Sequence, residues 1–328
     1  MDEEVTRDVV SVHDLQVSLT VGENTIAPVD GISFDVRAGE CLGIVGESGS
    51  GKSLSLRAVL GLLPPGAAST GSVRYAFANG TIAADAARVR GRGAAMVFQE
   101  PMTALNPTMR VGDLIAEAVR VTGLRSRRAI RGRVIEVMAS VGIPDPSRRA
   151  RMWPHELSGG LRQRVMIAAA LATEPEVLFC DEPTTALDVT IQDQILGLLR
   201  RLQEERGMAM VFVSHDLAVV AEVCDRIAVM YAGRVVETGP VDEVLRAPRH
   251  PYTAALLASA PSFAGGGQAL ATIPGSPPDP REFPRGCRFA PRCAFVTDAC
   301  LRASYTLDGG GERATACIRP EVLAEVAA

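Results

Sequence analysis

The chain of 328 residues has a single lysine, Lys52, among its 34 lysine and arginine residues. Because arginine serves at the other basic positions, this lysine marks a place that needs a compact ammonium on a flexible stem instead of a planar guanidinium. The formal net charge is −4, so the sequence lacks the overall excess of basic residues that is typical of nucleic-acid-binding proteins. We therefore expect no nucleic-acid partner.

Long apolar runs are missing as well. Although 47% of the residues are hydrophobic, no run reaches the roughly 18 apolar residues that a membrane-spanning helix needs. The first residues, Met1-Asp2-Glu3-Glu4, are acidic, which argues against a secretory signal. We expect a cytoplasmic protein, whose seven cysteines are reduced unless they bind something.

What the sequence does contain is a phosphate-binding loop around its lysine. The pattern G-x-x-x-x-G-K-[ST] is matched by Gly46, Glu47, Ser48, Gly49, Ser50, Gly51, Lys52 and Ser53. The apolar residues 41–45 predict a strand before the loop, and residues 54–60 predict a helix after it. The glycines let successive backbone N–H groups converge on a phosphate. Lys52 would reach the terminal phosphates, and Ser53 would ligate Mg²⁺.

Polar residues follow two further apolar strands. The strand predicted over residues 176–182 ends in Asp181 and Glu182. Carboxylates at the carboxyl end of a strand in the same sheet as a phosphate loop face the ligand crevice. Asp181 would hold Mg²⁺, and Glu182 would polarise an attacking water. His215 follows the strand predicted over residues 208–214, and we expect it to contact the γ-phosphate or that water.

The remaining pattern predicts an α/β fold with additions. Residues 9–21 and 31–36 alternate apolar and polar side chains, which predicts strands of an antiparallel layer. From residue 102 to about residue 154 strand patterns are absent, and helices are predicted over 111–121 and 127–141. This stretch is typical of a helical insertion in an α/β core. Its many arginines form either a solvated face or a surface for an anionic partner.

A second anion site is predicted at the start of another helix. Ser158 is a candidate N-cap, and Gly159 and Gly160 after it leave backbone N–H groups exposed. The amphipathic helix that follows is predicted to run to Thr173.

Cysteines gather near the end of the chain, at Cys287, Cys293, Cys300 and Cys317. Their spacing lacks the C-x₂-C pairs of common zinc sites. Four thiolates in a reducing compartment suit either an iron–sulfur cluster or zinc, and free thiols remain an alternative.

In this order the motifs resemble those of one family, the nucleotide-binding subunits of ABC transporters, over roughly residues 9–245. The resemblance identifies Gln99 with the Q-loop, residues 157–163 with the signature motif, residues 185–188 with the D-loop and His215 with the switch histidine. It implies a P-loop NTPase fold of the ABC type, with a mixed sheet core, an antiparallel β layer and a helical subdomain. The implied domains are residues 1–245, with the helical subdomain at about 102–157, and a C-terminal extension of residues 246–328.

The resemblance also implies a mechanism. Two such subunits would stack head to tail and hydrolyse ATP held between them. The catalytic residues would be Glu182, His215 and Gln99, and Mg²⁺ would be bound by Ser53, Gln99 and Asp181. Beside the phosphate loop, the implied ATP contacts are Ser158, Gly159, Gly160, Gln163 and Asp188.

Five stretches resemble the oligopeptide, dipeptide and nickel importers within the family: residues 99–107, 154–156, 250–253, 273–278 and 286–293. The resemblance implies an energy-coupling ATPase for peptides, on the cytoplasmic side of the membrane. Its implied partners are a second, different ATPase subunit, two membrane permease subunits and an extracytoplasmic solute-binding protein. It also favours a [4Fe-4S] cluster on the four tail cysteines over Zn²⁺.

Several alternatives stay open. Nickel or another small solute could replace the peptide, because the cargo is chosen by other subunits. A soluble ABC ATPase outside transport is disfavoured because the chain holds one cassette and a short helical insertion. A purely regulatory nucleotide binder would be expected to lack Glu182 or His215, and both are present. Leu19 stands where relatives often carry an aromatic residue that stacks on adenine.

Overall fold

The computed structural model describes residues 7–22, 24–80, 82–185, 187–260, 272–309 and 312–323. The acidic residues at the beginning of the chain and Ala186 of the predicted D-loop lie outside these ranges. The described residues divide into two compact units. The first unit contains residues 7–10, 36–39 and 74–211, and the second contains residues 11–35, 40–73 and those from 212 onward.

Helices dominate the first unit. They are α2 (Ala86–Val89), α3 (Pro101–Ala104), α4 (Val111–Val121), α5 (Arg127–Ser140), α6 (Pro146–Arg149), the 3-10 helix η1 (Pro154–Glu156), α7 (Gly159–Leu171) and α8 (Val189–Arg206). Two buried strands, β6 (Ala94–Val97) and β7 (Val177–Asp181), pair in parallel. The register places Ala94 opposite Val177.

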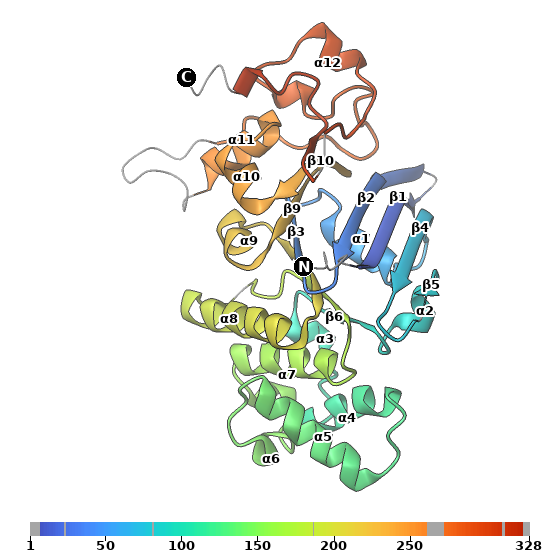
Figure 1. Ribbon diagram of the computed structural model, residues 1–328, viewed down its shortest axis with the longest axis vertical. Helices are drawn as coiled ribbons and strands as arrows, with labels where there is room; N and C mark the ends of the chain where they lie inside the picture. The colour runs from blue at the N-terminus through green and yellow to red at the C-terminus, as the bar shows by residue number, and fades with distance from the viewer. Residues whose placement is uncertain are drawn as a thin grey trace, which may run out of the picture. The chain divides into compact units, whose positions relative to one another are not determined.

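The helical insertion forms because two amphipathic helices bury one face each. In α4 the buried positions include Val111, Ile115 and Val119, which are four residues apart and so share one face of the helix. Helix α5 begins after Ser126, whose hydroxyl caps the helix by accepting from the N–H of Ala129. Figure 1 shows α4 and α5 next to each other beneath α7. Both helices confirm the sequence prediction, with α5 ending one residue early.

Long strands open the chain, and some of them are shared between the units. Strands β1 (Asp8–Val21), β2 (Asn24–Arg37) and β4 (Ala67–Ala76) follow the sheet order β2-β1-β4, and their larger parts lie in the second unit. In the first unit the end of β4 pairs antiparallel with β5 (Ile82–Ala83). The predicted β layer is therefore present.

The second unit holds a mixed sheet in the order β11-β10-β9-β3. Strand β3 (Cys41–Val45) is wholly buried and pairs in parallel with β9 (Arg226–Tyr231). Strand β10 (Arg234–Pro240) pairs antiparallel with β9 and with the short β11 (Ala314–Thr315). The predicted C-terminal extension thus contributes a strand to this sheet.

One more strand and the remaining helices complete the fold. Strand β8 (Ala209–Ser214) is divided between the units. The helices of the second unit are α1 (Lys52–Val59), α9 (Leu217–Val223), α10 (Val241–Arg246), α11 (Pro251–Ser259), the 3-10 helix η2 (Ala290–Arg292) and α12 (Asp298–Arg302). Within the described ranges, no helix combines the length and the apolar composition needed to cross a bilayer.

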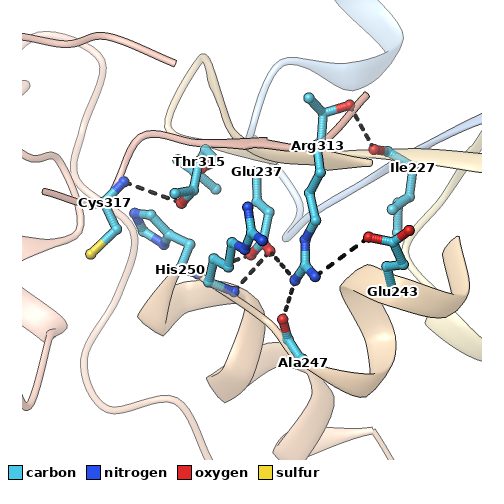
Figure 2. Close-up of polar contacts among 11 residues, drawn as sticks. Ile227, Glu237, Glu243, Ala247, His250, Arg313, Thr315 and Cys317 are labelled. Atoms are coloured by element: carbon cyan, nitrogen blue, oxygen red, sulfur yellow. Dashed lines mark hydrogen bonds and ion pairs between the residues drawn. The ribbon is translucent and has the colours of Figure 1, made fainter. Parts of the chain in front are cut away.

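A buried ion pair fastens the C-terminal extension to strand β10. Glu237 has no exposed surface, and its carboxylate accepts from the backbone N–H groups of Arg249 at 2.8 Å and His250 at 2.9 Å. Arg313, next to β11, lies 3.3 Å from the same carboxylate and also donates to the carbonyl of Ala247. Figure 2 shows Arg313 converging on Glu237 beside Glu243 and Ala247. Several hydrogen bonds thus compensate the burial of the carboxylate.

Candidate functional site

The phosphate loop lies between β3 and α1, in the second unit. Its turn depends on glycine, because a Cβ atom on Gly46 would lie 2.1 Å from the carbonyl oxygen of Met230. Gly51, with φ of 101°, occupies the N-cap position of α1. The buried Lys52 points back over the loop, where its Nζ donates to the carbonyls of Gly46 at 2.8 Å and Glu47 at 3.0 Å.

The loop is suited to a phosphate group. The N–H of Ser50 donates to the carbonyl of Glu47 at 3.2 Å, which closes a tight turn. The buried hydroxyl of Ser50 has no hydrogen-bond partner among the described residues. Such an atom in a glycine-rich turn ahead of a helix N-terminus fits an anion. Ser53, the predicted Mg²⁺ ligand, is in the first turn of α1.

His215 belongs to the same unit. It is exposed and follows β8 directly. The turn that carries it is fixed on both sides, because the N–H of Asp216 donates to Ser214 Oγ at 3.0 Å and the Asp216 carboxylate caps α9. The histidine is therefore presented on a short, well-defined turn.

In the first unit the structure brings Gln99 and Glu182 together. Glu182 follows β7 and has a positive φ of 44°, an unfavourable conformation for a non-glycine residue. Its Oε2 accepts from Gln99 Nε2 at 3.3 Å and from Thr185 Oγ1 at 2.9 Å. Two donors thus orient the carboxylate. The residue pattern alone does not predict the Thr185 contact, because it depends on how the loop after β7 turns back toward Glu182.

Asp181 is the last residue of β7 and is fully buried. Mg²⁺ prefers oxygen ligands, and each of the three predicted ligands offers one: the Asp181 carboxylate, the Ser53 hydroxyl and the Gln99 amide. The donor chemistry therefore fits the predicted ion. Asp181 and Gln99 belong to the first unit and Ser53 to the second.

The signature and D-loop residues both belong to the first unit. Ser158 is at the N-cap of α7, as predicted, but its side chain makes no capping hydrogen bond. A Cβ atom on Gly160 would lie 2.7 Å from Ile191 Cγ2, so glycine is needed where α7 packs on α8. Asp188 caps α8 by accepting from the N–H of Ile191 at 2.9 Å. Ser158 and Gly159 are exposed, whereas Gln163 is buried.

The predicted [4Fe-4S] cluster is wrong, and the alternative Zn²⁺ site finds no support. Among the described residues, no three or more cysteine, histidine, aspartate or glutamate side chains are placed to hold a metal ion. Cys287, Cys293, Cys300 and Cys317 instead line a cavity of about 30 Å³ with apolar neighbours. A cavity of that size admits about one water molecule.

Burial of these thiols works against metal binding. Burial raises the pKa of Cys287 and Cys293, and it raises that of Cys317 to about 11. A metal ligand must be a thiolate, so a metal here would have to displace protons from thiols that favour the neutral form. Spacing along the chain did not reveal that the side chains pack as small apolar groups.

Comparisons with known proteins agree with the motifs. A family profile described as ABC transporter matches residues 29–185. A second profile, described as the C-terminal region of oligopeptide/dipeptide transporters, matches residues 236–300.

Two curated relatives show how far the likeness extends. The Oligopeptide transport ATP-binding protein OppD of Mycobacterium tuberculosis is 48% identical over 319 residues, which cover 96% of this chain and 52% of that protein. The Dipeptide transport ATP-binding protein DppD of Bacillus subtilis is 46% identical over 298 residues, which cover 90% of this chain and 89% of that protein. The chain therefore spans about half the length of the mycobacterial relative and most of the Bacillus one.

A solved structure supports the fold. It is described as the dimeric, post-hydrolysis state of the ATP-binding cassette MJ0796 bound to ADP and Pi. The match has a TM-score of 0.61 at 29% identity and covers 71% of this chain and 98% of that one. Together with the curated relatives, it confirms the resemblance and the fold class inferred from the sequence.

Proposed function

Because this chain belongs to the family of ATP-binding subunits of ABC transporters, we propose that it hydrolyses ATP to drive the import of di- and oligopeptides. The observation that carries the peptide assignment is the match of residues 236–300 to the C-terminal region of oligopeptide/dipeptide transporters. The cassette match alone would support ATP hydrolysis with any cargo. The two matches in one chain support both parts of the proposal.

The phosphate loop and Lys52 would bind the phosphates of ATP. Converging backbone N–H groups suit a polyanion, and the one lysine adds a mobile positive charge. Mg²⁺, held by Ser53, Gln99 and Asp181, would neutralise charge on the phosphates when bound. The ATP contacts proposed on the signature and D-loop side are Ser158, Gly159, Gly160, Gln163 and Asp188.

Glu182 would act as the general base that orients the attacking water. Its carboxylate is held by Gln99 and Thr185, so it does not need to reorganise when water arrives. His215 would donate a hydrogen bond toward the reacting phosphate. Glu182 and its two hydrogen-bond donors belong to the first unit, and His215 belongs to the second.

We propose that the chain works with a second, different ATPase subunit, two permease subunits and an extracytoplasmic binding protein. The names of the curated relatives, which are peptide transport ATP-binding proteins, support such an assembly. The chain would lie at the cytoplasmic face of the membrane. The cassette would span residues 1–245, with its helical subdomain at about 102–157, and the C-terminal extension residues 246–328.

The test has two stages. Purified protein should release phosphate from ATP only when Mg²⁺ is present, and absence of hydrolysis with its partner subunits supplied would contradict the ATPase assignment. Cells that lack this chain should then lose uptake of a labelled tripeptide but keep uptake of nickel. Loss of nickel uptake alone would leave the ATPase role and replace the cargo.

A further inference from the structure

The second residue of the phosphate loop, Glu47, is held from the C-terminal extension. Arg292 donates to both carboxylate oxygens of Glu47, with Nη1 at 2.6 Å from Oε2 and Nη2 at 3.0 Å from Oε1. The Arg292 side chain is only 5% exposed, and that of Glu47 is 24% exposed. A two-pronged, largely buried ion pair of this kind is geometrically specific. The two residues are 245 positions apart in the chain.

The guanidinium of Arg292 is also held by residues other than Glu47. Its Nε donates to the carbonyl of Pro274 at 2.7 Å, and its Nη1 lies 3.3 Å from the hydroxyl of Tyr231. The guanidinium carbon lies 5.8 Å from the ring centre of Tyr231 and 6.0 Å from that of Phe289. Because the guanidinium is held by neighbours on several sides, it presents a preorganised fork to the loop.

Tyr252 of the extension supplies a second contact to the same residue. Its hydroxyl accepts from the backbone N–H of Glu47 at 2.8 Å. The Tyr252 ring is fully buried and packs 4.5 Å from Tyr231 and 5.4 Å from Phe289. Burial raises the pKa of Tyr252 well above its usual range, so the hydroxyl remains protonated. The aromatic cluster therefore anchors the backbone of Glu47, while Arg292 anchors its side chain.

The backbone carbonyl of Glu47 also accepts the hydrogen bonds that close the loop. It receives the N–H of Ser50 at 3.2 Å and the Nζ of Lys52 at 3.0 Å. Contacts that fix Glu47 consequently fix the turn that carries the phosphate-binding N–H groups. Arg292 also offsets the negative charge of Glu47, which would otherwise repel a triphosphate bound by this loop.

We propose that Arg292 is a positioning residue for nucleotide binding, through which the C-terminal extension holds the phosphate loop in shape and cancels the charge of Glu47. The proposal rests on the proposed function, because it assumes that the loop binds ATP. The C-terminal extension would then act in the ATPase site itself. When its contact with the phosphate loop is lost, the affinity for ATP falls.

The test is MgATP binding by isothermal titration calorimetry on the full-length chain. Arg292→Ala should raise Kd roughly fivefold or more, as expected when two groups are coupled. Glu47→Gln in the Arg292→Ala background should recover most of that affinity, because the unpaired carboxylate is gone. A purely structural contact would give no such recovery. Arg292→Lys, which keeps the charge without the fork, should lie between wild type and Arg292→Ala.

Arg288→Ala is the matched control. Arg288 is also a buried arginine of the extension, and it pairs with Asp30 and donates to the carbonyl of Ala232 at 2.5 Å, whereas the carboxylate of Glu47 is held by Arg292. Its removal should lower thermal stability and leave Kd close to that of wild type. An unchanged Kd for Arg292→Ala, or a double variant as weak as the single one, would overturn the proposal.

MgATP binding by Lys52→Ala separates the role of Arg292 from the proposed function. Lys52→Ala reports on the loop itself. If Lys52→Ala abolishes MgATP binding while Arg292→Ala leaves it unchanged, only the role of Arg292 falls. If wild-type protein and Lys52→Ala bind MgATP equally, the nucleotide site is elsewhere and both proposals fall. If Arg292→Ala does not fold, Arg292→Lys and Glu47→Gln still decide the question, because each retains one member of the pair.

Discussion

Gln99 donates from Nε2 to Oε2 of Glu182 across 3.3 Å, and Thr185 Oγ1 donates to the same oxygen at 2.9 Å. The acid proposed as general base is thus fixed by residues from two different loops of the first unit. Glu182 also keeps a positive φ of 44°. Backbone strain of this kind persists where the surroundings enforce it, and it concentrates at functional sites.

Glu182→Gln should bind MgATP with near wild-type affinity and lose turnover. Glutamine keeps the shape of the side chain but cannot accept a proton from water, and a general base contributes roughly 10²–10⁴-fold to the rate. Phosphate release and equilibrium binding measured on one preparation check both parts. Steady hydrolysis at the wild-type rate would remove Glu182 from this role.

Thr185→Val tests the orientation of that acid. The substitution keeps the side-chain shape and removes one hydrogen bond to Glu182, so kcat should fall modestly while the KM for ATP stays unchanged. Thr190→Val serves as the control, because Thr190 lies in the first turn of α8 and is exposed. An equal fall in kcat in both variants would show that the Thr185 hydroxyl has no specific role.

Lys52 allows an unusually direct test, because it is the only lysine of the chain. Lys52→Ala should weaken MgATP binding at least about tenfold, since hydrogen bonds to charged groups are worth about 1.5–3 kcal/mol. In the wild-type protein, an amine-reactive reagent can modify one lysine only, and MgATP should protect it. Mass spectrometry of the labelled peptide reads out the protection, and labelling unaffected by MgATP would contradict the loop assignment.

Gly46 and Gly49 should respond differently to alanine. A Cβ atom at Gly46 would lie 2.1 Å from the Met230 carbonyl oxygen and 2.9 Å from Ser50 Oγ, so the loop must shift. At Gly49 the space is open, and only the φ of 80° opposes a side chain, at about 1–2 kcal/mol. Gly46→Ala should therefore lose more thermal stability and more MgATP affinity. Equal losses would show that the close approach to Met230 is unimportant.

Local patterns predicted the elements that carry the motifs. The apolar run before Gly46 became the buried β3, and the run before Asp181 became β7, because continuous apolar residues bounded by turns are typical of buried strands. The N-cap position of Ser158 followed from residue type, although its capping bond did not form.

The sequence did not predict contacts between residues that are far apart in the chain. Nothing near Arg292 in the chain indicates that it pairs with Glu47, since the pairing depends on how β9, η2 and the loop before η2 pack around Tyr231. The tail cysteines show the opposite failure. Their number and the family resemblance suggested a metal, but the distances among sulfur atoms and the burial of the thiols are set by packing.

Arg313→Met should destabilise the second unit strongly. It leaves the wholly buried carboxylate of Glu237 without its cation, and breaking a buried pair in this way costs about 3–5 kcal/mol. Arg319→Ala is the control, because Arg319 makes a more exposed ion pair with Glu321 at 3.5 Å, where about 0–1 kcal/mol is expected. Urea unfolding followed by circular dichroism measures both. Similar losses would mean that the pair in Figure 2 adds little to stability.

His250 should make the stability of the protein fall as the pH falls. It is buried at the start of α11, where Nδ1 accepts from the N–H of Tyr252 at 3.0 Å, and burial lowers the pKa of His250 from 6.5 to about 3. Below about pH 6.5 the unfolded chain binds a proton that the folded chain does not, so the free energy of unfolding decreases by up to about 1.4 kcal/mol per pH unit. The contribution is complete above pH 6.5 and is lost progressively toward about pH 3.

His250→Asn separates this effect from the titration of carboxylates. Asparagine keeps an acceptor for the N–H of Tyr252 and does not ionise in this range. The charged and titratable groups around His250 include Glu237, which accepts from its backbone N–H, and the thiols and Arg319 that line a cavity with it. These remain in both proteins, so the difference between their urea midpoints at pH 7.5, 6 and 5 isolates the histidine. The wild type should lose stability relative to His250→Asn as the pH falls, and parallel curves would show that His250 takes up its proton in the folded state.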